Sequence, residues 1–455
     1  MLGDAAKKIA ALCGILIWPL FPHQVRSQAR EPFANPIDVS DEHLVFFDVD
    51  GRPLIEPHLA IDPDNDAHLA LATFVVSADL SKSDCIALAS FDSGQTWTRH
   101  DFGHASCADP WIAILPGGTV VLTVIAGDDS QVLVYRSEDG GRTWSKPLSL
   151  GAGFDHETFV VKNGEGKKPA EIYLTSATDT QEPGMKADRT AVVVARSLDG
   201  GKTFPETVRL FPSNLSLNSM NSIVSSDGTL VVLFGDFATT RVDGSMRLKT
   251  ERSWILRSSD QGKSFSSPIF VSEECAKSWE WLAVDKSSGP FRDRLYSLCT
   301  DGSYGHALLQ YSPDGGAQWS KPFYLNQVSG VEPYVRTPML AVNREGIVGV
   351  SWYDGRSDRA AYKQFLRCQE LYFSASLDGG VTFLPGVKVG SKRSCPLSPK
   401  NGDAGIRWPA GGDYSGLATD REGRFHLLWS DSRNGLYQLW TATVTVRGEH
   451  KDGKN

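Results

Sequence analysis

Several features that mark other classes of protein are missing from this sequence. Beyond residue 21 no segment is apolar for long enough to cross a bilayer, which takes about 20 residues. Hydrophobic spacing of the helical type is nearly absent, which argues against an α-helical fold. Basic residues are not in excess either. The formal net charge of −8 argues against nucleic acid and anionic membranes as partners.

Metal-binding patterns are missing as well. No Cys-x-x-Cys or His-x-x-x-His pair suggests zinc. The acidic segment DPDND at 62–66 lacks the glycine and the distal glutamate of a calcium loop, so we interpret it as a polar hairpin turn. We therefore expect neither a metal ion nor a cofactor.

The first 29 residues have the pattern of a secretory signal peptide. Two lysines precede the apolar run 9–21, and small residues follow it at the spacing that signal peptidase requires. A membrane anchor is the alternative, but thirteen apolar residues interrupted by Pro19 are too few to span a bilayer. The sequence thus predicts a secreted or periplasmic protein that is cleaved after Ala29 and has a linker over residues 30–42.

Six cysteines remain once Cys13 is removed with the signal peptide. An even number in an exported chain favours disulfides over metal ligands. Six cysteines allow fifteen pairings, and free buried thiols are a further alternative. We prefer pairing between sequence neighbours, which closes loops of 22, 24 and 27 residues: Cys85–Cys107, Cys275–Cys299 and Cys368–Cys395.

An octapeptide repeat organises the chain. Its pattern is Ser-x-Asp-x-Gly-x-Thr-Trp, with Ser allowed for Thr and Phe for Trp, and in one copy Gln318 replaces the Thr. The copies start 47 to 64 residues apart. The copies are SFDSGQTW at 90–97, SEDGGRTW at 137–144, SLDGGKTF at 197–204, SSDQGKSF at 258–265, SPDGGAQW at 312–319 and SLDGGVTF at 376–383. Repetition at this spacing indicates a β-propeller in which each copy belongs to one blade.

Each position of the octapeptide has a structural task. The aspartate accepts hydrogen bonds from turn amides, and the glycine adopts a positive φ that other residues resist. The closing aromatic ring packs between strands or between adjacent blades. We therefore interpret the aspartates as turn-forming residues, in preference to a catalytic or calcium-binding role.

Alternating apolar strands complete each repeated unit. One strand precedes each octapeptide, as in VLVYRS at 132–137, and two more lie earlier in the unit, as in WIAILPGGTVVLTVIAG at 111–127. Seven such units predict an all-β fold, a propeller of seven four-stranded antiparallel blades over residues 43–447, with six blades as the alternative and a polar tail at 448–455. The early strand 43–49 has no unit of its own. We expect it to be the outer strand of the seventh blade, so that the ring closes without an exposed edge.

One face of this propeller gathers the charged side chains. In an up-and-down blade, the segment before the first strand and the loop after the second strand share a face, and the octapeptides lie on the other. The residues before the first strands are Glu56, Asp109, Glu157, Asn221, Glu280, Arg336, Asp413 and Tyr414. Those after the second strands are Asp128 or Asp129, Asp179, Asp236, Asp301, Asp354 and Asp431, and the last two begin Asp-x-Arg with Arg356 and Arg433.

Two interpretations of this face remain open. Crowded carboxylates raise one another's pKa, as acid/base pairs require, and with nearby aromatic residues they favour a sugar-binding cleft. Turn capping and Asp–Arg stapling between loops would explain the same residues without any activity.

The octapeptides resemble the Asp boxes of the sialidase (neuraminidase) superfamily, also called BNR-repeat proteins, over about residues 43–447. The resemblance implies a tyrosine nucleophile polarised by a glutamate, an aspartate acid/base, and three arginines that clamp a sugar carboxylate. Tyr414 in YSGL resembles the nucleophile and Glu157 in ETFVV the glutamate, with Glu280 as second choice. Arg336 in RTPML resembles the third arginine.

The first arginine of the clamp is missing, because the matching stretch 54–57 reads LIEP. A lost bidentate arginine weakens carboxylate recognition. The arginines available as substitutes are Arg356, Arg433 and Arg407.

We therefore expect an exported propeller that acts on or binds carbohydrate, with glycoside hydrolysis as the favoured reaction. A non-catalytic propeller that binds glycan or protein and a purely structural module are the alternatives. If the protein is an enzyme, a carboxylate pair is as good a candidate as the tyrosine mechanism. That pair would come from Glu56, Asp109, Glu157, Glu280 and Asp354.

Overall fold

The computed structural model describes residues 35–448, apart from residues 105, 152–153, 165, 167, 181–188, 214–215, 243–244, 276–279, 302–304, 328–333 and 359–365. The predicted signal peptide lies outside the described residues. In the part described, no helix is long and apolar enough to cross a membrane. The regular structure there is β except for one short helix, α1 (Gly402–Arg407).

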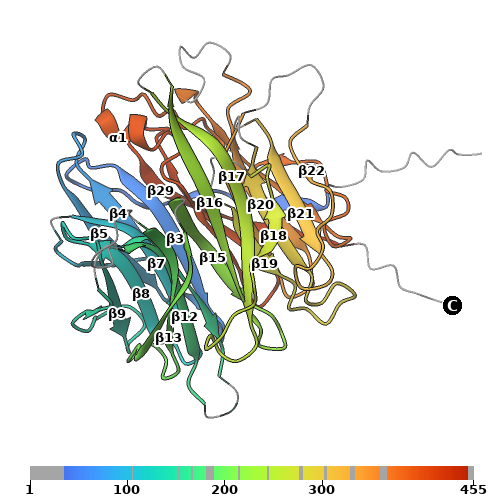
Figure 1. Cartoon of the computed structure of the whole chain (residues 1–455). Helices are drawn as coiled ribbons and strands as arrows, with labels where there is room; N and C mark the ends of the chain where they lie inside the picture. Colours follow the sequence, from blue (N-terminus) through green and yellow to red (C-terminus); the bar gives the residue numbers. More distant parts are fainter. Residues whose placement is uncertain are drawn as a thin grey trace, which may run out of the picture. The chain divides into compact units, whose positions relative to one another are not determined.

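Seven antiparallel sheets form the blades of a propeller, and each of the first six blades pairs its four strands in chain order (Figure 1). Blade 1 consists of β3 (Leu54–Asp62), β4 (Asn65–Val76), β5 (Ser83–Ser90) and β6 (Thr98–Asp101). Blade 2 consists of β7 (Cys107–Ile114), β8 (Val120–Ala126), β9 (Gln131–Ser137) and β10 (Leu148–Ser149). Blade 3 consists of β11 (Phe154–Lys162), β12 (Glu171–Thr180), β13 (Arg189–Ser197) and β14 (Glu206–Ser213). Blade 4 consists of β15 (Ser216–Val224), β16 (Leu230–Val242), β17 (Ser245–Ser258) and β18 (Ile269–Ser272). Blade 5 consists of β19 (Trp281–Val284), β20 (Leu295–Thr300), β21 (Ala307–Ser312) and β22 (Phe323–Tyr324). Blade 6 consists of β23 (Val335–Val342), β24 (Val348–Asp354), β25 (Glu370–Ser376) and β26 (Val387–Lys388).

Blade 7 joins the two ends of the propeller chain. It contains β27 (Gly416–Thr419), β28 (Phe425–Asp431) and β29 (Gln438–Val446), and β29 pairs on its outer side with β1 (Ile37–Val39) and β2 (His43–Phe46). The predicted seven blades and the closing strand at 43–49 are therefore confirmed. β1 adds a further closing strand within the range 30–42, for which the sequence predicted a linker.

Strand faces alternate so that the apolar side chains are buried between neighbouring blades. On β29, Ala442, Val444 and Val446 are buried and pack in one cluster with Tyr353 and Phe373 of blade 6. Because successive side chains of a strand point to opposite faces, the threonines between them face blade 1. The core is thus a series of layers between neighbouring blades. β29 contributes apolar side chains to the layer between blades 6 and 7, and threonines to the layer between blades 7 and 1.

The octapeptides form turns in which the aspartate is saturated with hydrogen bonds. In all six copies the preceding serine hydroxyl and the backbone N–H four residues later donate to the aspartate. In five copies a Thr or Ser hydroxyl donates to its second oxygen at 2.6–2.7 Å. These bonds lower the pKa of Asp92 and Asp139 to about 2, which suits turn-forming carboxylates rather than acid/base groups.

The fifth copy lacks the hydroxyl donor at the threonine position, because Gln318 stands there. Gln318 donates to Asp314 through its backbone N–H and not through its side chain. We expect Gln318→Thr to raise the free energy of unfolding by about 0.5–1 kcal/mol by restoring the hydrogen bond from the hydroxyl. Thr143→Gln, at the same position of the second copy, should lower it by a similar amount. Urea unfolding at pH 7 measures both, and a Gln318→Thr protein no more stable than the parent would contradict the role assigned to the hydroxyl.

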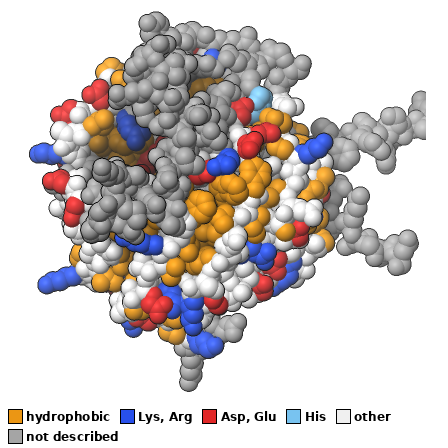
Figure 2. Space-filling model, viewed as in Figure 1, with side chains coloured by type: hydrophobic (Ala, Val, Ile, Leu, Met, Phe, Trp, Pro, Cys, Tyr) orange, Lys and Arg blue, Asp and Glu red, His pale blue; other side chains and the backbone are white. Residues whose placement is uncertain are grey.

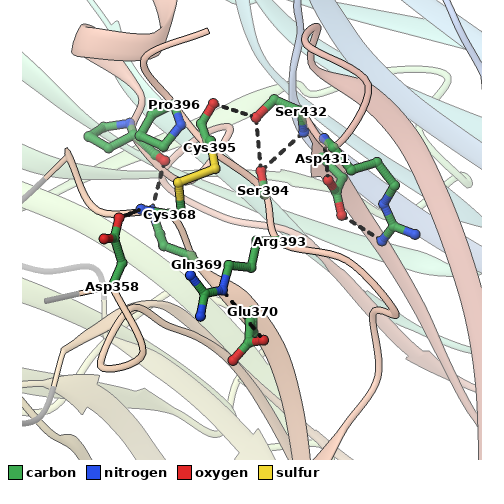
Figure 3. The surroundings of a disulfide bond; sticks show 12 residues. Asp358, Cys368, Gln369, Glu370, Arg393, Ser394, Cys395, Pro396, Asp431 and Ser432 are labelled. Atoms are coloured by element: carbon green, nitrogen blue, oxygen red, sulfur yellow. Dashed lines mark hydrogen bonds and ion pairs between the residues drawn. A yellow bond between two sulfur atoms is a disulfide. The ribbon is translucent and has the colours of Figure 1, made fainter. Parts of the chain in front are cut away.

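All three predicted disulfides are present: Cys85–Cys107, Cys275–Cys299 and Cys368–Cys395. The third lies in a network of hydrogen bonds between blades 6 and 7 (Figure 3). Ser432 donates through its hydroxyl to the Cys395 carbonyl at 2.7 Å and through its backbone N–H to Ser394 Oγ at 3.0 Å. The disulfide therefore fixes the chain that follows β26 against the end of β28.

Charged side chains of both signs are interspersed on the face seen in Figure 2, around a patch of hydrophobic side chains. Among the side chains drawn in colour on that face, neither sign of charge forms a continuous field. Such a surface provides little electrostatic attraction for a polyanion.

Candidate functional site

The inner strands of five blades share the same irregularity. In β3, β7, β11, β15 and β23 one extra residue interrupts the pairing with the next strand. Such bulges bend a strand and re-aim side chains, and they are common beside active sites. In four of them the first bulge residue has a positive φ: Glu56 (52°), Asp109 (52°), His156 (48°) and Thr337 (47°). A non-glycine residue in this region costs about 1–3 kcal/mol, so the surrounding structure must hold it there.

Glu56 and Asp109, the first bulge residues of adjacent blades, meet at one mouth of the ring. Their carboxyl groups share a hydrogen bond. Glu56 Oε1 also accepts a hydrogen bond from the backbone N–H of Asp413 at 3.1 Å. Glu56 is 2% exposed, whereas Asp109 and Asp413 are half-buried. The site is thus a buried carboxyl group hydrogen-bonded to one that reaches solvent.

The pKa values of this pair are raised. Burial raises the pKa of Glu56 well above its ordinary value, and the charges of Asp109 and Asp413 raise it further. Burial raises the pKa of Asp109 to about 6, while the hydrogen bond from Glu56 acts in the opposite direction. Glu56 is therefore the protonated donor and Asp109 the acceptor. Near neutral pH the two carboxyl groups hold one proton between them.

Two consecutive glycines bring Asp413 against this pair. Gly412 has a φ of 138°, and a Cβ atom there would lie 2.4 Å from Cγ of Glu56 and 2.8 Å from its backbone nitrogen. The carbonyl of Gly411 accepts a hydrogen bond from the Glu56 N–H at 2.9 Å. Only glycine allows the loop to approach the Glu56 bulge this closely.

Aromatic rings fill the centre of the propeller beside the acidic pair. The Tyr414 ring lies edge-on to those of Trp111, Trp281, His58 and His156, at centroid distances of 5.6, 6.2, 6.5 and 6.0 Å. Trp111 stacks on His58 at 3.7 Å and on Trp281 at 5.8 Å. Burial lowers the pKa of His58 to about 3 and that of His156 to about 4. Both imidazoles are therefore neutral at neutral pH and do not offset the charge of the carboxylates.

Tyr414 is not arranged as the nucleophile that the sialidase resemblance implies. Its hydroxyl donates to the Pro110 carbonyl at 3.1 Å, and the residue is 1% exposed. Burial, together with the charges of Glu56 and Asp109, raises its pKa well above the ordinary value. Among the described residues Tyr414 and Glu157 do not form the hydrogen bond that this resemblance implies, because the Tyr414 hydroxyl donates to Pro110 instead.

Glu157 and Glu280 occupy a different register position from Glu56 and Asp109. Glu157 is the second residue of its bulge, after His156, and its pKa is raised well above the ordinary value by burial and then by Asp109. Glu280 accepts a hydrogen bond from Ser297 of β20, and burial raises its pKa to about 7. Both are at most 1% exposed. Glu280 thus lies within the body of blade 5 and takes no part in the hydrogen bonds of the acidic pair.

Two candidate arginines are held by carboxylates of their own loops. Nε of Arg356 donates to Asp354 at 2.7 Å. Arg433 donates to Asp431 at 2.6 Å and also to Glu42, and its side chain is 1% exposed. The same aspartates accept hydrogen bonds from the backbone N–H groups of Arg356 and Arg433, so the geometry favours the turn-capping interpretation. Arg433 also ties its loop to another segment through Glu42. Neither arginine points free into a pocket as a substitute for the missing clamp residue.

The other two candidate arginines each contact an aromatic side chain. Arg336 is half-buried and donates through Nε to the Tyr334 hydroxyl at 3.2 Å. Arg407 ends α1, where it is exposed and lies 5.0 Å from the ring centre of Trp408. In the described residues we find no group of three or more His, Cys, Asp or Glu side chains placed to hold a metal ion.

The aromatic lining was missed by sequence reasoning, although the sequence contains a signal for it. His58, Trp111 and Trp281 begin the similar tripeptides HLA, WIA and WLA, and Met339 begins MLA. Aligning these tripeptides would have placed the four side chains at one level of the ring. It would also have shown that Glu280, one residue before its tripeptide, is out of register with Glu56 and Asp109.

No protein-family model matches this chain, and no curated protein matches its sequence. Among solved structures, a protein of unknown function from Dyadobacter fermentans is similar at 12% identity and a TM-score of 0.52, over 90% of this chain and 100% of that one. A Hadza microbial sialidase is 17% identical over 84% of this chain and 74% of its own, with a TM-score of 0.47. An α-L-arabinofuranosidase of Fusarium graminearum is 12% identical over 74% and 92%, with a TM-score of 0.43. At these identities the likeness concerns the fold alone, and the chain is a seven-bladed β-propeller protein.

Proposed function

We propose that this protein is an exported, carbohydrate-active propeller that cleaves glycosidic bonds at the mouth formed by Glu56, Asp109 and Asp413. The observation that carries the proposal is the hydrogen-bonded Glu56–Asp109 pair, held on two strained bulges with raised pKa values. Strained backbone and shifted carboxyl pKa values gather at catalytic sites. The signal-peptide pattern and three disulfides support export to an oxidising compartment.

Asp109 is the group that we assign to the chemistry. It is half-buried and ionised above about pH 6, so it can act as general base toward water or as nucleophile toward an anomeric carbon. Glu56 is a positioning residue, since it is almost fully buried and donates its proton to Asp109. A second carboxyl group must be protonated to deliver a proton to the leaving oxygen. Asp413 is the candidate, since its side chain lies close enough to affect the pKa of Glu56 and Asp109, and it must take up a proton from solvent before each turnover.

A non-catalytic glycan-binding propeller is the second candidate function. Two observations favour it. Arg356 and Arg433 are ion-paired with Asp354 and Asp431. The Tyr414 hydroxyl donates its hydrogen bond to a backbone carbonyl. In this case the acidic pair would be a recognition group, and no glycoside would be turned over.

A panel of chromogenic glycosides, sialosides included, tests the proposal on the purified protein. We expect hydrolysis of at least one glycoside, and we expect Tyr414→Phe to retain more than a tenth of the turnover, because the hydroxyl only caps a backbone carbonyl. Loss of turnover by a hundredfold or more in a folded Tyr414→Phe protein would restore the tyrosine mechanism. Absence of hydrolysis across the panel, with saturable glycan binding, would favour the binding function.

A further inference from the structure

A cleft lies on the seam between blade 7 and blade 1, on the side of the octapeptide turns. Its volume is about 730 Å³, within the range of small-molecule sites. One wall is formed by β28, β29 and the closing strands β1 and β2, and the other by the first octapeptide turn, residues 93–97. Leu59 and Leu69 of blade 1 also line it. Neither Glu56 nor Asp109 lines this cleft.

The blade 7 wall is a regular array of polar side chains. Thr441, Thr443 and Thr445 alternate along β29 and all line the cleft. Side chains two residues apart on a strand are separated by about 7 Å. The closing strands continue these rows, because His43 pairs opposite Thr441 and Asp38 opposite Thr445.

The opposite wall combines an indole with an amide. Trp97 lines the cleft and donates through Nε1 to the Gly94 carbonyl at 3.0 Å, which fixes the orientation of the ring. Gln95 is exposed at the tip of the same turn. Leu44, which is 42% exposed, adds apolar surface from the blade 7 wall. The cleft therefore offers apolar surface for ring faces and the Gln95 amide for hydrogen bonds. Of its threonine hydroxyls, that of Thr441 already donates to the Leu427 carbonyl at 2.7 Å and so offers a ligand only an acceptor, and that of Thr443 lies 3.4 Å from His426 Nδ1.

The charged groups of the cleft are paired with residues that lie outside its lining. Arg424 donates to Asp420 at 2.6 Å and lies 3.4 Å from Glu422. His426 also contacts Asp420, at 2.8 Å. Asp38 forms an ion pair with Arg447 at 3.3 Å. With its arginine held by two carboxylates, the cleft does not favour an anionic ligand.

We propose that this seam cleft binds a neutral oligosaccharide, at a site separate from the acidic pair. Sugar rings present apolar faces and rows of hydroxyl groups, which match the Trp97 and Leu44 surfaces and the threonine row respectively. The inference does not depend on catalysis, since it concerns different residues on a different face. A carbohydrate-active protein with this cleft would hold a polysaccharide at two places.

The test measures calorimetric binding of neutral hexasaccharides of glucose, xylose, mannose and arabinose to the full protein. We expect saturable binding of at least one of them, weakened tenfold or more in the double variant Gln95→Ala/Thr443→Val. Arg142→Ala is the matched control, because Arg142 has the position of Gln95 in the second octapeptide and lies outside the cleft. It should bind as the parent does.

A second pair of variants distinguishes a specific effect on binding from a general loss of folded structure. Trp97→Phe keeps an aromatic ring of the kind found in three other octapeptides, and it should weaken binding where Trp144→Phe does not. Absence of binding to all four hexasaccharides would overturn the proposal. So would binding that is lost in Asp109→Asn but unchanged in the cleft variants, because the glycan would then occupy the channel mouth. Hydrolysis is measured separately, so failure of the cleft and failure of the proposed reaction are distinguishable.

Discussion

Asp109→Asn is expected to lower turnover about a thousandfold, because it removes the carboxylate that acts on water or on the anomeric carbon. Glu56→Gln should retain more than a tenth of the activity. Its amide can still donate to Asp109 and accept from the Asp413 N–H, as the protonated glutamic acid does. Glu56→Ala removes both contacts and should lose more than Glu56→Gln. Steady-state kinetics on the best substrate of the glycoside panel measure all three.

The pH profile provides a second readout. Asp109 must be ionised to act, and its pKa is about 6, so kcat/KM should fall as the pH drops through about 6. If Glu56→Gln were as inactive as Asp109→Asn, we would assign the proton transfer to Glu56. Full activity in Asp109→Asn would contradict the assigned site, provided that circular dichroism shows the variant to be folded.

Replacing Cys368 and Cys395 by serine together is expected to lower the free energy of unfolding by about 3–4 kcal/mol, since the disulfide closes a loop of 27 residues. It should also lower turnover at least tenfold. The disulfide fixes Ser394 and Cys395 against Ser432 (Figure 3). Further along the chain, the same connection leads through Gly412 to Asp413. A looser segment no longer holds Asp413 beside Glu56.

The double replacement of Cys275 and Cys299 is the matched control. This bond closes a similar loop of 24 residues in blade 5 and has no contact with the acidic pair. It should cost about as much stability while leaving turnover within threefold of the parent. Equal losses of activity in both proteins, measured well below their unfolding temperatures, would refute the positioning role of Cys368–Cys395.

The fold was predictable because its determinants are local. Each octapeptide specifies its own turn through a serine, an aspartate and a glycine within five residues, and six copies establish the period of the blades. The strand at 43–49 was placed by elimination, as the partner required by an otherwise exposed edge. The disulfides were predicted on a separate ground, the preference for the shortest loops among the fifteen pairings, and the observed bonds close those loops.

The site was predictable only in part, because a bulge changes which residues face the channel. Glu56 and Asp109 were among the candidates, but Glu157 and Glu280 were grouped with them although they are one residue out of register. A shift by one residue moves a strand side chain to the opposite face, and no composition signal marks the extra residue. The ion pair between Arg433 and Glu42 could not be predicted from the sequence either, since the two residues are 391 positions apart.

The joining of both chain ends in blade 7 has a consequence for the order of folding. Ser40 and Thr443, which bond to each other, are 403 positions apart, so β1 and β2 leave the ribosome long before their partner strand exists. During that interval the stretch HLVFFDV at 43–49 is a β-prone, apolar segment without a partner, the kind that seeds aggregation. Once six blades have stacked, the ring itself brings the ends together, and the entropic cost of closing so long a loop is largely met beforehand. The last step of folding is then a docking of two short strands, and a chaperone that shields residues 43–49 until then would raise the yield of folded protein.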